Sequence, residues 1–259
     1  MLEPNSTGRA MDSPQHLQDA EYRFPYHYVS QWRPHFTQAF CDTWGINYVS
    51  TIEHLLERLG RHEFRSIVDI GCGDGRLTRE IATAFPGREV LGVDYSARAI
   101  GLAQAMNADV VASFRQLDVT APHVVGRHDV AMLVEVLEHV PPAAAPAFLR
   151  GVHRLLRPGG TLIVTVPHSN RPVDETHYRH FDGASLADAL GEQFTVAEMM
   201  PFERQSLSRR VLDGLLANRL FVLNHRRTLD RLYGYYRRRL FRCADESECR
   251  RLLAVVHPR

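Results

Sequence analysis

The sequence predicts an α/β protein with a doubly wound, mostly parallel seven-stranded sheet and helices on both of its faces. Over residues 62–200, short continuous apolar runs alternate with helical patterns, which is typical of parallel strands buried on both faces. The run at 66–70 leads into a glycine-rich turn and then a helical pattern at 76–85. In open sheets of this kind, such a turn lies beside the ligand.

Four regions follow one another along the chain. Residues 1–20 are polar, without clear periodicity, and we expect them to be disordered. Residues 21–61 are rich in aromatic side chains and are predicted as a helical cap, which either folds over the site as a lid or packs onto the domain. Residues 62–200 are the predicted core. Residues 201–259 are predicted as a basic helical appendage with a closing strand.

Composition excludes several classes of protein. The 259 residues are 44% hydrophobic, and a net charge of +1 gives no strong overall attraction to nucleic acid or to membranes. No apolar run approaches the roughly 20 residues that span a bilayer, and the N-terminus lacks the apolar segment of a signal peptide. Four scattered cysteines indicate a reducing, cytoplasmic setting.

The glycine-rich turn carries the strongest signal. It reads Gly-Cys-Gly-Asp-Gly from Gly71 to Gly75, and Asp69 precedes it by two residues. Glycines allow a tight turn and a close approach to a ligand. The spacing differs from the Gly-x-Gly-x-x-Gly of dinucleotide sites, and no Lys-Ser/Thr pair follows, which excludes a P-loop. Cys72 is expected to be a small filler of the turn.

The next two predicted strands each end in an acidic residue. Asp94 ends the apolar run 89–94, where a carboxylate can accept hydrogen bonds from both hydroxyls of a ribose. Asp118 ends the run that begins at Ser113, where it can accept a hydrogen bond from an adenine amino group. Each acid also has a plainer interpretation as a helix cap or a solvated loop residue.

Five ordered motifs carry a family resemblance. They are Asp-Ile-Gly-Cys-Gly-Asp-Gly from Asp69, Gly-Val-Asp ending at Asp94, Asp118, Glu-Val-Leu-Glu-His from Glu135, and Leu-Arg-Pro-Gly-Gly from Leu156. In this order the chain resembles class I S-adenosylmethionine-dependent methyltransferases. It is most similar to the branch that holds ubiquinone-biosynthesis O-methyltransferases and many small-molecule and sugar methyltransferases. The resemblance covers residues 62–200 and leaves the methyl acceptor open; a dehydrogenase-like domain is the alternative.

The resemblance implies the cofactor contacts. The backbone at Gly71 and Gly73 would meet the methionine part of S-adenosylmethionine, and Asp69 would orient the turn or bind the amino group. Asp94 would hold the ribose, and Tyr95 would lie against the adenine. The residues expected to contact the cofactor are Asp69, Gly71, Cys72, Gly73, Asp94, Tyr95, Asp118, Val119 and Glu135.

Four histidines are candidates for catalysis. A hydroxyl acceptor must lose a proton when it is methylated, and an imidazole takes protons near neutral pH. His139, after the fourth predicted strand, is the first candidate for the base, and His168, after the fifth, is the second. His177 and His180 either face the pocket or fix their loop. A Glu-His pair at this place also occurs in relatives where it is not catalytic.

A divalent metal is an alternative use of the same residues. Glu135, Glu138 and His139, with His177 or His180, offer carboxylates and imidazoles in a pattern similar to that of small-RNA 2′-O-methyltransferases. The surroundings differ, because residues 179–183 read Arg-His-Phe-Asp-Gly where that family has a Phe-Glu-Trp run. Metal-free relatives also carry Glu-x-x-Glu-His. S-adenosylmethionine is therefore the expected cofactor, and a divalent metal at these residues is the alternative.

The C-terminal segment is strongly basic. Between residues 204 and 242 we count eleven arginines against two aspartates, with tyrosines interleaved. The plainest interpretation is a solvated pair of helices packed on the core. Alternatively, the segment binds a small anionic acceptor, or it binds RNA or an anionic lipid surface. This segment and the aromatic N-terminal arm also allow a homo-oligomer.

The predicted function is methyl transfer from S-adenosylmethionine to a small-molecule acceptor, on an oxygen of a sugar or natural product. The first alternative is a metal-assisted ribose 2′-O-methyltransferase that acts on RNA. The second is a non-catalytic cofactor-binding scaffold, which would bind the donor without turnover and would be insensitive to changes at the four histidines.

Overall fold

The computed structural model describes residues 29–33, 36–38, 43–122, 127–216, 220–221, 223 and 225–259, with side chains from residue 45 onward. The predicted disordered segment, 1–20, and much of the aromatic arm lie outside the described residues.

A seven-stranded sheet forms the centre of the molecule. Its strands lie in the order β5-β4-β3-β6-β7-β9-β8, and all neighbours pair in parallel except β9, which is antiparallel to both β7 and β8. The strands are β3 (Ser66–Ile70), β4 (Glu89–Asp94), β5 (Ser113–Gln116), β6 (His128–Val134), β7 (Leu156–Pro167), β8 (Phe194–Arg204) and β9 (Cys249–Pro258). The predicted doubly wound, mostly parallel sheet is confirmed.

Alternate residues of the strands build a core on each face of the sheet. Ile67 of β3 belongs to the core shared with helices α2 and α3, and the adjacent Val68 belongs to the core shared with α5 and α6. This follows from the two-residue period of a strand, and it explains why β3 reads as an unbroken apolar run. The helices are α2 (Thr43–Leu59), α3 (Arg76–Ala84), α4 (Ala97–Met106), α5 (Ala145–Leu155) and α6 (Gly183–Gly191).

The region before the sheet is only partly helical. Helix α2 fulfils the prediction for residues 43–59, and its apolar side chains Ile46, Val49 and Ile52 are buried. The prediction of a helical cap over 21–61 is wrong at 29–38, where strands β1 (Val29–Arg33) and β2 (Phe36–Gln38) form an antiparallel hairpin. Proline at position 34 has no N–H and disfavours a continuous helix there.

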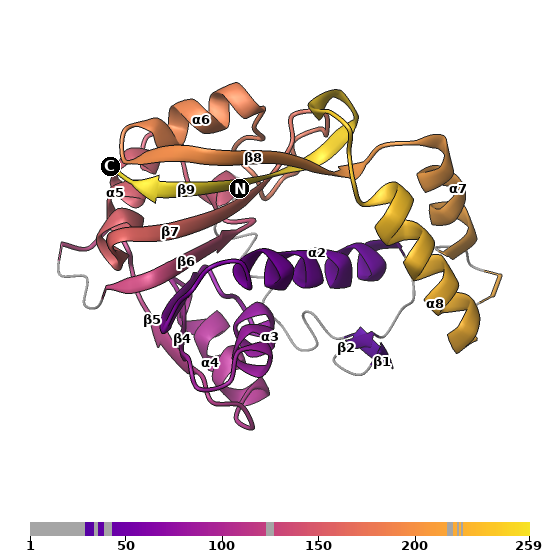
Figure 1. Cartoon of the computed structure of the whole chain (residues 1–259), viewed down its shortest axis with the longest axis horizontal. Helices are drawn as coiled ribbons and strands as arrows, with labels where there is room; N and C mark the ends of the chain where they lie inside the picture. Colours follow the sequence, from indigo (N-terminus) through magenta and orange to yellow (C-terminus); the bar gives the residue numbers. More distant parts are fainter. Residues whose placement is uncertain are drawn as a thin grey trace, which may run out of the picture.

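The C-terminal region is not an appendage to a finished core. Strand β8 runs past residue 200 to Arg204, and β9 lies between β7 and β8, so the sheet is incomplete without residues 201–259. Helices α7 (Leu207–Leu216) and α8 (Arg226–Tyr235) and the π-helical turn η2 (Tyr236–Leu240) connect these two strands and project together at one end of the molecule (Figure 1). Among the described helices, none is both long and apolar enough to cross a membrane.

Candidate active site

A cavity of about 1530 Å³ opens at the carboxyl ends of β3, β4, β5 and β6. The turns that follow these strands form its walls, because parallel strands bring their carboxyl ends to the same edge of the sheet. Helix α2 contributes Tyr48, Thr51 and Leu55 to the opposite wall. All nine residues predicted to contact the cofactor line this cavity, as do His139 and His177.

The turn after β3 depends on glycine at position 71. Its φ of 74° lies in the left-handed region, and a Cβ on Gly71 would clash with Cγ2 of Val136. The amides of Gly71 and Cys72 donate hydrogen bonds to the carbonyl of Val93, at 2.8 and 3.0 Å. The turn is thereby fixed to the end of β4, with its backbone against the cavity.

Three carboxylates gather beneath this turn. Asp69, Asp74 and Asp94 are all buried. Burial raises the pKa of Asp69 to about 7, and the charges of Asp94 and Asp74 add to the increase, although Thr78 Oγ1 donates a 2.7 Å hydrogen bond to its Oδ2. A ligand that carries an ammonium group would favour the ionised form of Asp69. This part of the cavity therefore suits a cationic ligand.

Asp94 is held in a fixed orientation at the end of β4. Its Oδ2 accepts a 3.0 Å hydrogen bond from the amide of Gly73, and its Oδ1 accepts one of 2.8 Å from the amide of Ser96. The next residue, Tyr95, is 72% exposed at the cavity rim. Burial raises the pKa of Cys72, so its thiol stays neutral and packs as a filler.

The third wall of the cavity begins where β5 ends. Val119 is buried, whereas Asp118 is exposed and its Oδ1 accepts hydrogen bonds from the amide and Oγ1 of Thr120, at 2.9 and 2.6 Å. Asp118 is thus pre-oriented by its own loop. Asp118 and Tyr95 both line the cavity, and the adenine contacts are predicted at these two residues.

Glu135 follows β6 in a left-handed backbone conformation, with φ of 54°. Its Oε1 accepts a 2.9 Å hydrogen bond from Thr165 Oγ1, and its Oε2 lies 3.3 Å from Nε of Arg251. The guanidinium of Arg251 also lies 3.2 Å from the buried Glu203 and lines the cavity. Sequence reasoning missed Arg251, because its strand reaches this site only through an antiparallel return.

The contacts of His139 define its tautomer. Its Nδ1 lies 2.8 Å from the carbonyl oxygen of Thr176, and a carbonyl can only accept, so Nδ1 carries the proton. Nε2 is therefore the acceptor nitrogen of the ring. Burial lowers the pKa of His139, which keeps the imidazole neutral near pH 7. The ring has the protonation state that a general base requires.

His177 and His180 form a short chain of imidazoles. His180 Nδ1 donates to the carbonyl of Arg171 at 3.1 Å, so its Nε2 accepts from His177 Nδ1 at 2.8 Å. The Nε2 of His177 is then left as an acceptor. Burial, together with His139 and His180, lowers the pKa of His177 to about 4. His177 faces the cavity, and His180 lies behind it.

His168 is not placed to act as the base, which corrects that prediction. It is 4% exposed and does not line the cavity. Its Nδ1 accepts a 2.9 Å hydrogen bond from the amide of Asn170, and its Nε2 therefore donates to Oε1 of Glu246 at 2.8 Å. Both ring nitrogens are occupied in joining the end of β7 to the segment before β9, so His168 has a structural role.

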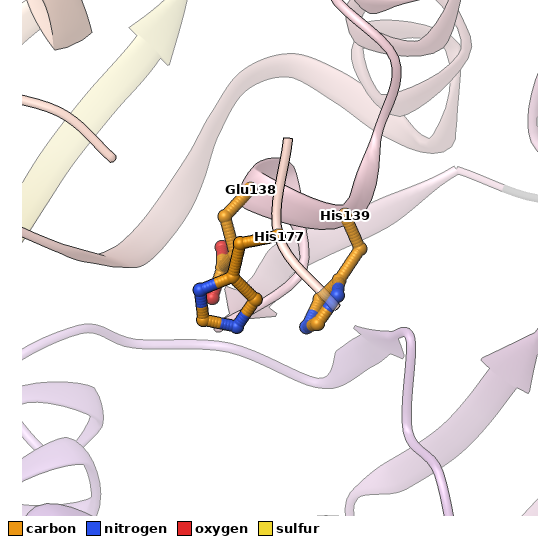
Figure 2. Close-up of side chains that lie close together, drawn as sticks. All are labelled: Glu138, His139 and His177. Carbon is orange, nitrogen blue, oxygen red and sulfur yellow. The ribbon is translucent and has the colours of Figure 1, made fainter. Parts of the chain in front are cut away.

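Glu138 lies beside these imidazoles at the base of the cavity (Figure 2). It is fully buried, and neither of its carboxylate oxygens has a hydrogen-bond partner among the described residues. Burial, and secondarily the charge of Glu135, raises its pKa well above the usual range. Ligand atoms of Glu138, His139 and His177 lie within 4.8 Å of one another. The set of donors is one that can bind a metal ion.

Comparison with known proteins finds a methyltransferase domain in the chain. Residues 67–160 match the family model described as a methyltransferase domain. This segment contains the glycine turn, Asp94, Asp118 and the His139 loop, and the strand order around it is that of a doubly wound sheet with one antiparallel strand. Residues 67–160 thus carry a methyltransferase domain, and the sheet around it has the fold of solved S-adenosylmethionine-dependent methyltransferases.

The curated relatives of this chain include ubiquinone biosynthesis O-methyltransferases. The chain is 36% identical over 124 residues to the ubiquinone biosynthesis O-methyltransferase of Alkalilimnicola ehrlichii, covering 46% of this chain and 48% of that protein. It is 31% identical over 158 residues to the enzyme of the same name from Paraburkholderia xenovorans, covering 60% and 61%. The chain thus spans about half the length of the first of these relatives.

Solved structures agree on the fold. The N-methyltransferase NodS of Bradyrhizobium japonicum WM9, solved with S-adenosyl-L-homocysteine, aligns with a TM-score of 0.60 over 95% of this chain and 99% of that one, at 16% identity. Magnesium protoporphyrin IX methyltransferase of Synechocystis PCC 6803 aligns with a TM-score of 0.53 over 82% and 84%, at 19% identity.

Proposed function

We propose that this chain transfers the methyl group of S-adenosylmethionine to an oxygen atom of a small-molecule acceptor, a sugar or natural product. One observation carries the proposal: the glycine turn with its carboxylates and the His139–His177 wall line the same cavity. A donor and an acceptor can therefore meet without crossing solvent. The names of the curated relatives support oxygen as the atom that is methylated.

The residues present fit the donor. S-adenosylmethionine supplies a methyl group on a positively charged sulfur, beside an ammonium group and an adenosine. Asp69 and its neighbouring carboxylates stabilise positive charge, and Asp94 offers two oriented oxygens to the ribose hydroxyls. Val119 and Asp118 provide an apolar and a polar contact for the adenine edge.

His139 acts on the acceptor. Its Nδ1–H is fixed by the carbonyl of Thr176, which directs the acceptor lone pair of Nε2 away from that loop. A hydroxyl bound against Nε2 would donate its proton there while its oxygen takes the methyl group from the donor sulfur, which would leave as the neutral thioether of S-adenosylhomocysteine. Most of the acceleration comes from positioning, because the reaction is a direct in-line displacement. Apolar side chains of α2, such as Leu55, help to exclude water.

A reducing, cytoplasmic setting belongs to this proposal. Cys72, Cys243 and Cys249, the cysteines that the structure describes, are free thiols, and burial raises the pKa of each. Neutral buried thiols fit a compartment in which disulfides are not needed for stability.

The test is a methyl-transfer assay with labelled donor and a panel of hydroxylated sugars and phenols. We expect His139→Gln to lower turnover by about 10²–10⁴-fold and to leave donor binding intact. His168→Gln is the control, because this histidine is more deeply buried than His139 and lies outside the cavity. Equal activity of His139→Gln and wild type on the best acceptor would exclude His139 as the base.

A second candidate function is favoured by the cluster of Glu138, His139 and His177. The acceptor nitrogens of the two imidazoles and the buried carboxylate of Glu138 would bind a divalent cation, which would engage the ribose hydroxyls of an RNA end. Because the pKa of Glu138 is raised, binding of the cation would release a proton. Calorimetry with Mg²⁺, Mn²⁺ and Zn²⁺ tests this candidate; activity that survives chelation would exclude it.

The same methyl-transfer assay distinguishes a non-catalytic scaffold from both candidate functions. It predicts donor binding with no turnover on small molecules or RNA, in wild type and in every histidine variant.

A further inference from the structure

The lobe formed by α7, α8 and η2 is not used by the proposed mechanism. None of its residues lines the cavity, and it projects at the end of the molecule opposite α5 (Figure 1). Leu212 of α7 and Leu229 and Tyr233 of α8 are buried, so both helices are attached to the body through one face. Their remaining faces point outward.

The polarity of α7 is inverted relative to an ordinary surface helix. Arg209 is buried, where it pairs with the buried Glu203 at 2.9 Å. Leu207, Val211 and Leu215, by contrast, are 76%, 65% and 43% exposed. A spacing of four residues places these three side chains on one face of the helix, opposite the attached face. Exposed apolar stripes of this kind mark sites that contact an apolar medium or a partner.

The same lobe gathers positive charge. Three arginines of the segment are paired, Arg204 with Glu248, Arg209 with Glu203 and Arg237 with Glu57. Seven more are exposed: Arg210, Arg226, Arg227, Arg231, Arg238, Arg239 and Arg242. Asp230 is the exposed acid among them. Because the whole chain has a net charge of only +1, the positive charge of the molecule is concentrated at this end.

Leu220 and Phe221, in the segment between the two helices, are also exposed apolar side chains. Leu220 is 91% exposed and Phe221 is 50% exposed. The exposed aliphatic side chains of the lobe, Leu207, Val211, Leu215 and Leu220, outnumber its exposed aromatic rings, Phe221 and Tyr235. A nucleic-acid site relies instead on aromatic rings that stack on bases. Apolar side chains that enter the interface, beside cations that contact anionic head groups, are the features of peripheral membrane helices.

We propose that the α7–α8 lobe docks on the surface of a bilayer that contains anionic lipids. Leu207, Val211 and Leu215 enter the head-group boundary, and the exposed arginines of α8 and η2 contact the lipid phosphates. The proposal does not depend on the methyl acceptor, because the lobe lies outside the cavity.

Co-sedimentation with vesicles tests the proposal. The full chain should bind vesicles of phosphatidylcholine mixed with phosphatidylglycerol and should not bind phosphatidylcholine alone. Raising the salt concentration should weaken binding, because the arginine contribution is screened. Leu207→Gln with Val211→Gln, and separately Arg231→Gln with Arg238→Gln, should each weaken binding by about tenfold or more.

A matched control separates the lobe from general stickiness. Val111 is 91% exposed and Arg61 is exposed, and both lie outside the lobe, so Val111→Gln with Arg61→Gln should bind vesicles like wild type. Binding of S-adenosylhomocysteine by each variant shows that it is folded. Three results would overturn the proposal: no vesicle binding, equal loss in the control variant, or a dimer or an RNA complex that Leu207→Gln with Val211→Gln disrupts while vesicles remain unbound.

Discussion

The raised pKa of Asp69 should make the affinity for the donor's product depend on pH. Its pKa, about 7, means that it is half protonated at neutral pH in the unliganded chain. The ammonium group of S-adenosylhomocysteine would favour the ionised form. Affinity for S-adenosylhomocysteine should therefore rise about tenfold per pH unit below pH 7 and become level above it. Calorimetry across this range, in buffers of different ionisation enthalpy, also measures the released proton.

Two variants make this prediction specific. Asp69→Asn should remove the slope and should bind less tightly than wild type above pH 7. Asp118→Asn is the control, because Asp118 is exposed on another wall of the cavity: it should lower affinity and keep the slope. An unchanged slope in Asp69→Asn would show that another group binds the proton.

Single residues also show where sequence reasoning succeeds. The position of Asp94 was predictable, because an acid at the end of an apolar run must lie at the carboxyl edge of a parallel sheet. The role of His168 was not, since its partner Glu246 is 78 residues further along the chain. A histidine after a strand looks the same in sequence whether its nitrogens face a substrate or a carboxylate.

At the scale of elements, the glycine turn after β3 makes a sharp prediction. Gly71 and Gly159 both have φ of 74°, but a Cβ would clash with Val136 only at Gly71, since nothing lies within 4 Å at Gly159. Gly159→Ala should cost about 1–2 kcal/mol of stability, from backbone conformation alone, and should retain donor binding. Gly71→Ala should cost more and should also abolish binding. Chemical denaturation and calorimetry measure the two effects, and similar behaviour of the two variants would contradict the assigned role of the turn.

The order of the strands was predictable in part. Within residues 66–167 the strands are visible in the sequence as apolar runs between helical patterns, and they pair in parallel in the order β5-β4-β3-β6-β7. The insertion of β9 between β7 and β8 was not predictable, because an antiparallel return reads the same at an edge or in the interior. Arg251 and its contacts with Glu135 and Glu203 were missed for that reason.

For the whole molecule, Glu203 connects the lobe to the sheet. Burial alone would raise its pKa, but Arg251, Arg209 and Arg250 outweigh burial and hold the pKa below its usual value. Glu203→Gln would leave these buried cations without their counter-charge. It should reduce the free energy of unfolding by about 3–5 kcal/mol. Glu248→Gln, at the more exposed pair with Arg204, should change it by only about 0–1 kcal/mol. If thermal or urea denaturation gave the same loss of stability for both variants, the buried ion pairs of Glu203 would not contribute more than the exposed pair of Glu248.

Strand pairing also changes the division of the chain into regions. Charge and composition separate residues 201–259 from the core, and a sequence divided by composition yields a separate appendage. Pairing overrides composition, because the backbone of β9 bonds to two strands, β7 and β8, that the sequence places earlier. The basic segment is therefore an insertion between two strands of the sheet.

A calorimetric titration of the purified chain with S-adenosylhomocysteine is the first experiment to make, because it measures whether the cavity binds the methyl donor's product. We expect saturable binding of one molecule per chain at pH 8, weakened by Asp94→Asn and absent in Gly71→Ala. A chain that is folded by circular dichroism and that gives no binding heat at several temperatures would contradict it, since the cavity would then belong to a domain that has lost its cofactor.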